Sequence, residues 1–207
     1  MPTTQLRRER EKAEFRSEVL RAARKIVIRD GFDALSMRKI AESIEYSPGT
    51  IYLYFESRDA IAKALCQQSF VELVRALAPA AAIKDPRKRL EKFGELYVRF
   101  GLEHAESYRL VFMEDAKFST PMFKDDHDDR SPGQQALGFL IAAFEELKAQ
   151  KRIPTSANCA ELADLLWVSV HGIVSLKLTC PEYPETSTDR LTRLMSNALL
   201  DGIIGRE

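Results

Sequence analysis

The sequence predicts an all-α fold, in which a three-helix unit at the N-terminus is joined by one long helix to a larger set of helices. Apolar residues recur at helical spacing along most of the 207-residue chain. No stretch shows the polar–apolar alternation of a half-buried strand. A pair of short helix patterns with a tight break between them lies within residues 36–55.

Residues 36–55 carry the start and stop signals of two short helices. Ser36 stands where its hydroxyl can accept from an orphan backbone N–H of the first helix. The apolar residues of that helix share one face: Met37, Ile40, Ala41 and Ile44. The second helix begins at Ser47-Pro48, because serine is a good N-cap and proline is favoured at the first helical position. This layout predicts a helix-turn-helix, whose second helix enters the major groove of DNA.

Small residues at the start of the second helix would let its backbone approach DNA closely, and the nearby tyrosines and basic residues could reach phosphates. The candidate DNA-contact residues are Ser36, Arg38, Tyr46, Ser47, Gly49, Thr50, Tyr52, Tyr54 and Arg58. Thr50 and Tyr46 are the candidates for base contacts, which specify sequence. In the alternative, purely structural interpretation, Tyr52 and Tyr54 belong partly to the core and Ser36 is only a cap.

Several segments match one known pattern in order and spacing: Val19-Leu20-Arg21-Ala22-Ala23, Gly31-Phe32, Ser36–Ala41, Ser47–Phe55 and Ser57-Arg58-Asp59. With them, the N-terminal part resembles the DNA-binding domain of the TetR family of bacterial transcriptional regulators. The resemblance implies a homodimer that reads a palindromic operator, with half-sites about 34–36 Å apart. It also implies a repressor that a small-molecule effector releases from DNA.

The turn of the motif departs from the family pattern. The family usually has Ala-Gly-Val before the serine, whereas this chain has Ile44-Glu45-Tyr46. A glycine there would suit a left-handed residue, and another residue in that conformation costs about 1 kcal/mol. We therefore expect a slightly altered turn, in which Tyr46 adds a DNA contact.

A long helix is expected from Ser57 to about Ala78, with no flexible linker after the helix-turn-helix. Further helices are expected near residues 86–104, 131–151, 159–179 and 188–203. The helix over 159–179 is apolar almost all round, so it must be buried on several sides. The last two helices carry more apolar surface than one small domain covers, which predicts a homodimer interface.

The C-terminal half resembles the ligand-binding half of one TetR subgroup, whose hallmark is a Trp…His-Gly signature, here Trp167 and His171-Gly172. The expected domains are 13–73 for DNA binding and 80–207 for effector binding and dimerisation. Candidate residues for an aromatic effector pocket are Phe93, Tyr97, Phe100, Phe112, Phe139, Trp167 and His171. An ordinary core is the alternative for the phenylalanines and Tyr97, and packing at the dimer interface is favoured for Trp167 and His171.

Composition excludes several other classes of protein. Net charge is zero, and residues 1–60 carry 12 Lys/Arg against 10 Asp/Glu, so a general nucleic-acid coat protein is disfavoured. The three cysteines lack metal-ligand spacing and suggest reduced thiols in a cytoplasmic protein. The best membrane candidate, Leu162–Leu178, is judged too short and too charged, so no membrane partner is expected. The acidic run Asp125–Asp129, with His127, is interpreted as a solvated loop.

No enzyme motif is present in the sequence, and no cofactor or metal is expected. The expected function is therefore sequence-specific binding of double-stranded operator DNA by a repressor that a small, largely apolar effector releases. Two alternatives stay open: a ligand-insensitive DNA-binding regulator, and a helical small-molecule-binding protein whose DNA binding is weakened by Glu45.

Overall fold

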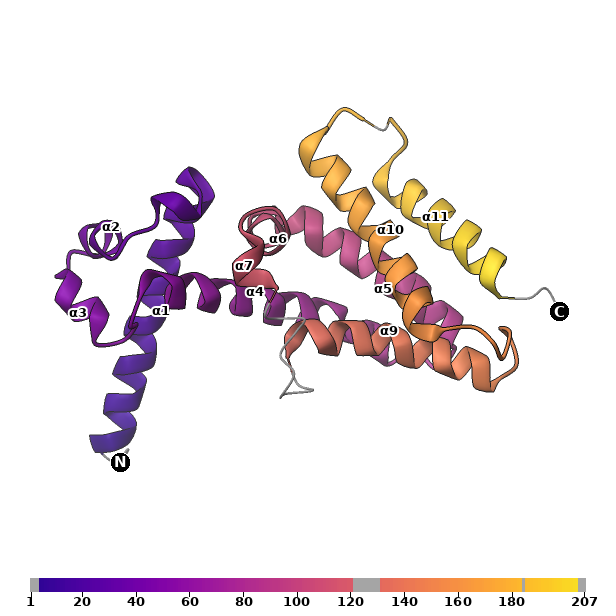
Figure 1. Cartoon of the computed structure of the whole chain (residues 1–207), viewed down its shortest axis with the longest axis horizontal. Coiled ribbons are helices and arrows are strands. Elements are labelled where there is room, and N and C mark those ends of the chain that lie inside the picture. The colour runs from indigo at the N-terminus through magenta and orange to yellow at the C-terminus, as the bar shows by residue number, and fades with distance from the viewer. Residues whose placement is uncertain (1–3, 121–130, 184, 205–207) are drawn as a thin grey trace. The chain divides into compact units, whose positions relative to one another are not determined.

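The computed structural model describes residues 4–120, 131–183 and 185–204, and these residues form helices joined by short connections (Figure 1). The all-α prediction is confirmed: within the described ranges no strand occurs. Contacts divide the chain into two compact units. Unit 1 comprises Met1–Ser69 with Arg109–Pro121, and unit 2 comprises Phe70–Tyr108 with Met122–Glu207. The acidic run at 125–129 lies outside the described residues.

Unit 1 is built on α1 (Thr4–Asp30), followed by the short 3₁₀ helix η1 (Phe32–Ala34), α2 (Met37–Ser43) and α3 (Pro48–Tyr52). The first half of α4 (Arg58–Ala81) also belongs to it. Helix α1 begins earlier than its apolar pattern: residues 5–14 are all exposed. Exposed i,i+4 pairs such as Arg7–Glu11 and Arg10–Glu14 stabilise this polar segment.

A later segment of the chain completes the core of unit 1. The second half of α6 (Ala105–Phe112) and the one-turn helix α7 (Ala116–Ser119) bring Leu110 and Phe118 into that core. The Phe118 ring lies 4.8 Å from the Phe32 ring. No local pattern predicts this arrangement, because the contact between Phe32 and Phe118 joins residues more than 80 positions apart.

Unit 2 is centred on α5 (Pro86–Glu103), which packs against α9 (Pro132–Ala149), α10 (Cys159–Thr179) and α11 (Thr188–Ile203). Its core side chains come from all four helices: Leu90, Phe93, Tyr97, Leu140, Phe144, Leu166, Val170 and Leu200. Gly101 lets α5 approach α10 closely, since a Cβ placed there would lie 2.4 Å from Val174 Cγ1.

Two expectations about helices are wrong. The first concerns the end of α4, which was expected before Pro79. Instead, α4 continues through this proline for two more residues. The second concerns membrane length: α10 has 21 residues and is long and apolar enough, by length and composition alone, to cross a membrane. A core helix of a water-soluble domain passes the same test, and α10 packs against three helices of unit 2.

Candidate functional site

The helices α2 and α3 are each fixed by a serine cap and a buried apolar anchor. The Ser36 hydroxyl accepts from the Lys39 backbone N–H at 3.1 Å, which confirms the expected cap of α2. Ser47 does the same for α3 by accepting from the Thr50 N–H at 3.1 Å. Its Oγ also lies 2.9 Å from Thr50 Oγ1. In α3 only Ile51 is buried, so the rest of this helix faces outward.

The turn between α2 and α3 keeps the left-handed residue that the family pattern fills with glycine. Glu45 has φ of 58°. This conformation lets the Tyr46 N–H reach back to the Ala41 carbonyl at 3.0 Å. The turn is therefore formed with a glutamate in a conformation that favours glycine, and the carboxylate is exposed next to the recognition helix.

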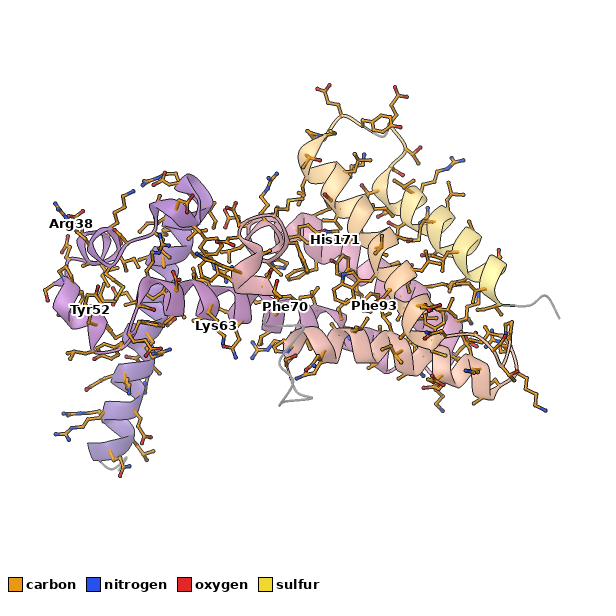
Figure 2. All side chains as sticks on the ribbon, viewed as in Figure 1. Arg38, Tyr52, Lys63, Phe70, Phe93 and His171 are labelled. Carbon is orange, nitrogen blue, oxygen red and sulfur yellow. The ribbon has the colours of Figure 1, made fainter. Side chains whose placement is uncertain are left out.

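The candidate DNA-contact residues come together on α2, on α3 with its flanks, and at the start of α4, all in unit 1. Five of them are exposed: Arg38, Tyr46, Ser47, Gly49 and Tyr52. Four are half-buried: Ser36, Thr50, Tyr54 and Arg58. Figure 2 shows Arg38 on α2 and Tyr52 on α3 among the outward side chains of this unit.

One exposed residue of this surface was not among the candidates from the sequence. Leu53, directly after α3, is 79% exposed, the highest value among the large hydrophobic side chains of the described residues. The sequence contained a sign of this exposure. Leu53 is an apolar residue between two tyrosines, and it does not share the helix face of the buried Ile51. Tyr52 is 55% exposed beside it, so two large side chains project at the end of α3.

The basic side chains of this surface are held by weak pairs. Arg38 pairs with Glu42 at 2.7 Å and Arg58 with Asp59 at 3.3 Å. In both pairs at least one partner is more than half exposed. Exposed ion pairs contribute about 0.2–1 kcal/mol, so little free energy is lost when either arginine exchanges its carboxylate partner for a DNA phosphate.

In unit 2, four of the seven candidate effector residues form an aromatic cluster, in which the Phe93 ring lies 6.1 Å from the rings of Tyr97, Phe139 and Trp167. Phe100 is buried on the same helix as Phe93, and His171 contacts Tyr97. The seventh candidate, Phe112, is assigned to unit 1. Phe139, Trp167 and His171 are half-buried (Figure 2 labels Phe93 and His171).

A buried polar cluster joins α5, α6 and α10 within this aromatic region. His171 Nδ1 lies 3.1 Å from the Tyr97 hydroxyl and 2.7 Å from the Tyr108 hydroxyl. Tyr108 also donates to the His171 carbonyl at 3.3 Å. Tyr108 was not a candidate from the sequence, because its α6 position shows no periodic relation to the other two residues.

Burial keeps all three members of this cluster neutral near pH 7. It lowers the pKa of His171 below its ordinary value of 6.5. The pKa of Tyr97 is raised, mainly by burial and then by the neighbouring Tyr108. The pKa of Tyr108 is raised by burial as well. The cluster thus offers neutral hydrogen-bonding groups in an apolar surrounding.

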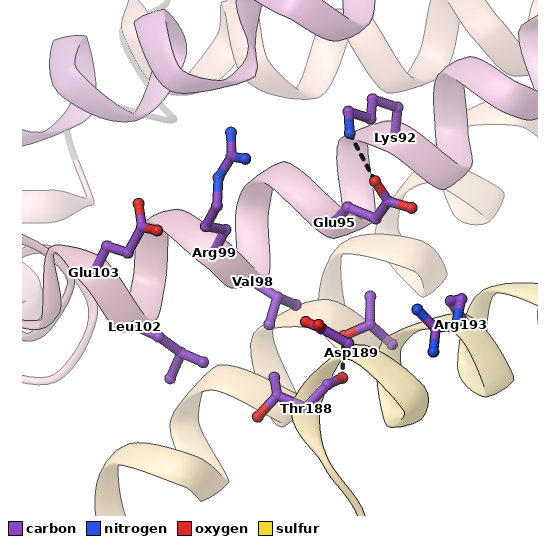
Figure 3. Close-up of a pocket in the computed structure, with 10 residues that line it drawn as sticks. Lys92, Glu95, Val98, Arg99, Leu102, Glu103, Thr188, Asp189 and Arg193 are labelled. Carbon is purple, nitrogen blue, oxygen red and sulfur yellow. Dashed lines mark hydrogen bonds and ion pairs between the residues drawn. The ribbon is translucent and has the colours of Figure 1, made fainter.

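A separate cavity of about 430 Å³ lies between α5 and α11 (Figure 3). Its lining is mostly charged or polar, and none of the candidate effector residues is among the ten side chains that line it. Lys92 and Glu95 pair there at 2.8 Å. An open, charged cavity of this kind does not match the apolar pocket expected from the sequence.

Two features of the described ranges bear on metal binding and nucleophilic chemistry. No group of three or more His, Cys, Asp or Glu residues is placed there to hold a metal ion. The Cys66 thiol is buried and lies 3.7 Å from the Leu110 carbonyl. Burial, with a smaller contribution from Asp115, raises its pKa to about 12, so it is a poor nucleophile.

Capped α2 and α3, the buried anchor and the outward polar face together define a helix-turn-helix DNA-binding protein. Two family models match the chain: "Bacterial regulatory proteins, tetR family" over residues 19–65, and "Tetracyclin repressor-like, C-terminal domain" over residues 90–199. The second covers more than half of the chain. The chain belongs to the TetR family of bacterial transcriptional regulators, a non-enzymatic family, and the family resemblance of the sequence is confirmed.

Individual relatives agree with this assignment. The HTH-type transcriptional regulator UidR of Escherichia coli K12 is 41% identical over 63 residues, which is 30% of this chain and only 31% of UidR. An uncharacterized HTH-type transcriptional regulator of Mycobacterium bovis, Mb1581, is 23% identical over 90% of this chain and 87% of its own length. A solved protein of unknown function from Rhodococcus sp. RHA1 shares the fold, with a TM-score of 0.72 and 22% identity over 92% of this chain and 95% of that one.

Proposed function

We propose that this protein is a homodimeric repressor that binds a palindromic operator through α3 and is released by a small, largely apolar effector. DNA binding and transcription regulation follow from the family. The repressor role, the operator symmetry, the contact residues and the effector are the proposal. The observation that carries it is α3 itself, a capped helix with one buried residue and an outward face of small residues.

Two substitutions in α3 test the operator contacts. Thr50→Ala removes a hydroxyl at the start of the helix, and Tyr52→Ala removes a ring that is 55% exposed. Each is expected to weaken operator binding by about 1–3 kcal/mol, the range of a lost base contact. A matched control is Tyr183→Ala, since Tyr183 is 65% exposed in unit 2. Unchanged operator affinity in both α3 variants would remove these residues from the interface.

The aromatic cluster around Phe93 is the effector site that we propose. Its aromatic rings are apolar surface of the kind that binds apolar ligands, and the hydroxyls of Tyr97 and Tyr108 supply the few polar groups that such sites use for orientation. An effector releases DNA only if it binds the DNA-free conformation more tightly than the DNA-bound one. Phe112, which lies in unit 1, is not part of this proposed site.

Truncation at the half-buried Phe139 tests this site. Apolar compounds that raise the Tm of the protein are first screened for release of operator DNA. Phe139→Ala is then expected to change the compound concentration at half-release without changing operator affinity in its absence. Leu137→Ala, on the same helix, is the control. If both variants respond like the wild type, the effector binds elsewhere.

A ligand-insensitive regulator is the second candidate, and dense packing favours it. Phe93, Tyr97 and Tyr108 are all 0% exposed, as in a filled core. In that case no apolar compound raises the Tm or releases the operator, while Thr50→Ala still weakens DNA binding.

A further inference from the structure

The recognition helix α3 is too short to fix its own orientation. It has five residues, Pro48–Tyr52, and isolated helices of this length are unstable in water. Ile51 is its single buried residue, and α3 also packs against the short helix α2. With so small a buried surface, contacts from the longer helix α1 add to those that set the angle at which α3 meets DNA.

Phe15 of α1 touches the residues that flank both ends of α3. Its ring lies 4.9 Å from the Tyr46 ring, in an edge-on arrangement at 74°. It also lies 4.5 Å from the Tyr54 ring. Tyr46 precedes the cap Ser47, and Tyr54 follows the end of α3, so one side chain bridges the two ends of the helix.

Arg16, the next residue of α1, contacts the two residues Tyr54 and Phe55 that follow the C-terminal end of α3. Its Nη1 donates a hydrogen bond to the Tyr54 carbonyl. Its guanidinium carbon lies 4.0 Å from the centroid of the Phe55 ring, a cation–π contact. The N–H groups of Tyr54 and Phe55 both donate to the Ile51 carbonyl, so Arg16 holds the backbone that closes α3.

We infer that Phe15 and Arg16 are positioning residues for DNA recognition, and we call them the α1 clamp. They hold α3 at the angle that brings its first residues to base edges, without touching DNA themselves. This inference rests on the proposed role of α3 in operator binding. Because base contacts depend on small displacements and phosphate contacts do not, loss of the clamp reduces selectivity more than general DNA affinity.

The DNA-contact candidates from the sequence include neither residue. Phe15 belongs to the apolar stripe of α1, and Arg16 is one of many charged residues near the N-terminus. The link to α3 spans 38 residues between Arg16 and Tyr54, and it is visible only in the fold.

The first test needs no DNA. Arg16→Met keeps an unbranched apolar stem but removes the guanidinium group, and with it the hydrogen bond and the charge. In amide hydrogen exchange, Leu53, Tyr54 and Phe55 are expected to exchange about tenfold faster or more, since a hydrogen bond to a charged group is lost. Ile40 and Ala41 of α2 should be unchanged. Arg21→Met, at an exposed arginine of the same helix, is the matched control.

The second test compares operator with scrambled DNA. Arg16→Met and Phe15→Leu are expected to weaken operator binding about tenfold or more while scrambled-DNA binding changes little. The salt dependence should stay the same, whereas loss of a direct phosphate contact would lower the slope of log K against log salt by about 0.9. Arg16→Lys should behave like Arg16→Met, because lysine lacks the planar fork.

The outcomes separate the clamp from the function on which it rests. Unchanged exchange at Leu53–Phe55 in Arg16→Met would overturn the clamp, as would a lowered salt slope with unchanged selectivity, which would make Arg16 a phosphate ligand. If the wild type itself shows no selectivity for an operator, the proposed function fails. The amide hydrogen-exchange measurement alone then decides whether the α1 clamp orders α3.

Discussion

At Glu45 the turn keeps a left-handed backbone conformation, although the glycine of the family pattern is replaced by glutamate. The turn needs a left-handed residue so that the Tyr46 N–H can bond the Ala41 carbonyl. An L-residue with a side chain pays about 1–2 kcal/mol for that conformation. The chain tolerates this cost, and it also places a negative charge beside the DNA-facing helix.

Glu45→Gly is expected to raise the free energy of unfolding by up to about 1 kcal/mol, because relief of the left-handed strain exceeds the greater entropy of glycine in the unfolded chain. Glu45→Gln keeps the strain and removes only the charge, so its stability should stay near that of the wild type. Urea denaturation measures both. Equal stability of the glycine and glutamine variants would mean that the turn carries no strain.

His171 makes the stability of the protein depend on pH. Its folded-state pKa lies below the ordinary 6.5 because of burial, so the unfolded chain binds a proton more readily. The free energy of unfolding therefore falls as pH drops below about 6.5 and levels off below the folded-state pKa, with no contribution above pH 7. Denaturation at a series of pH values measures this slope.

Removal of the imidazole tests this prediction. In His171→Gln the slope between pH 7 and 5 should flatten, even if the variant is less stable throughout because the bonds to Tyr97 and Tyr108 change. A wild-type slope in His171→Gln would assign the pH dependence to other groups.

At the residue scale, local chemistry was readable from the sequence and distant contacts were not. The caps Ser36 and Ser47 follow from neighbouring residues alone, and both were predicted. Arg16 and Tyr108 act through partners on other helices, and no local pattern marks them.

At the scale of elements, a close contact between α5 and α10 in unit 2 depends on Gly101. A Cβ at this position would lie 2.4 Å and 2.9 Å from the two Val174 methyl groups. Since α5 packs against three other helices, displacing it from α10 would disturb the whole unit.

Gly101→Ala is expected to destabilise the protein by about 1–3 kcal/mol, because overpacking exceeds the gain in helix propensity. Gly138→Ala, in α9 with no atom within 4 Å of the new Cβ, should stabilise by about 0.5–1 kcal/mol. Val174→Ala should partly rescue Gly101→Ala by removing the opposing methyl groups. Thermal or urea unfolding of the four variants checks the series; a neutral Gly101→Ala would show that α5 can shift freely.

Helix positions were predictable because apolar periodicity and caps are local signals. The grouping of these helices into two units was less predictable, because the assignment of 109–121 to unit 1 rests on contacts of Leu110 and Phe118 with residues far away in the sequence. The domain limits 13–73 and 80–207 remain a prediction.

At the scale of the whole molecule, α10 and α11 expose apolar side chains that the single chain leaves uncovered. Leu165, Val168 and Leu194 are 49%, 67% and 53% exposed. Gly172 lies on the exposed side of α10, with no atom within 4 Å of an added Cβ. A second copy of the chain would cover this surface, in agreement with the proposed homodimer.

Val168→Glu, and separately Leu194→Glu, should therefore convert a dimer into a monomer of 23.5 kDa. Burying an unpaired carboxylate at an interface costs several kcal/mol, more than most single contacts provide. Light scattering with size-exclusion chromatography measures the mass. Ala142→Glu, an equal change at an exposed site on α9, should remain dimeric. Dimers in all three variants would place the interface elsewhere.

Binding of the purified wild-type protein to DNA upstream of its own gene tests most directly whether α3 reads DNA. Scrambled DNA of equal length is the comparison, at two salt concentrations. We expect selective binding whose affinity falls steeply with salt, because phosphates are neutralised while bases are read. Equal, weak binding to both DNAs would contradict operator recognition at this site.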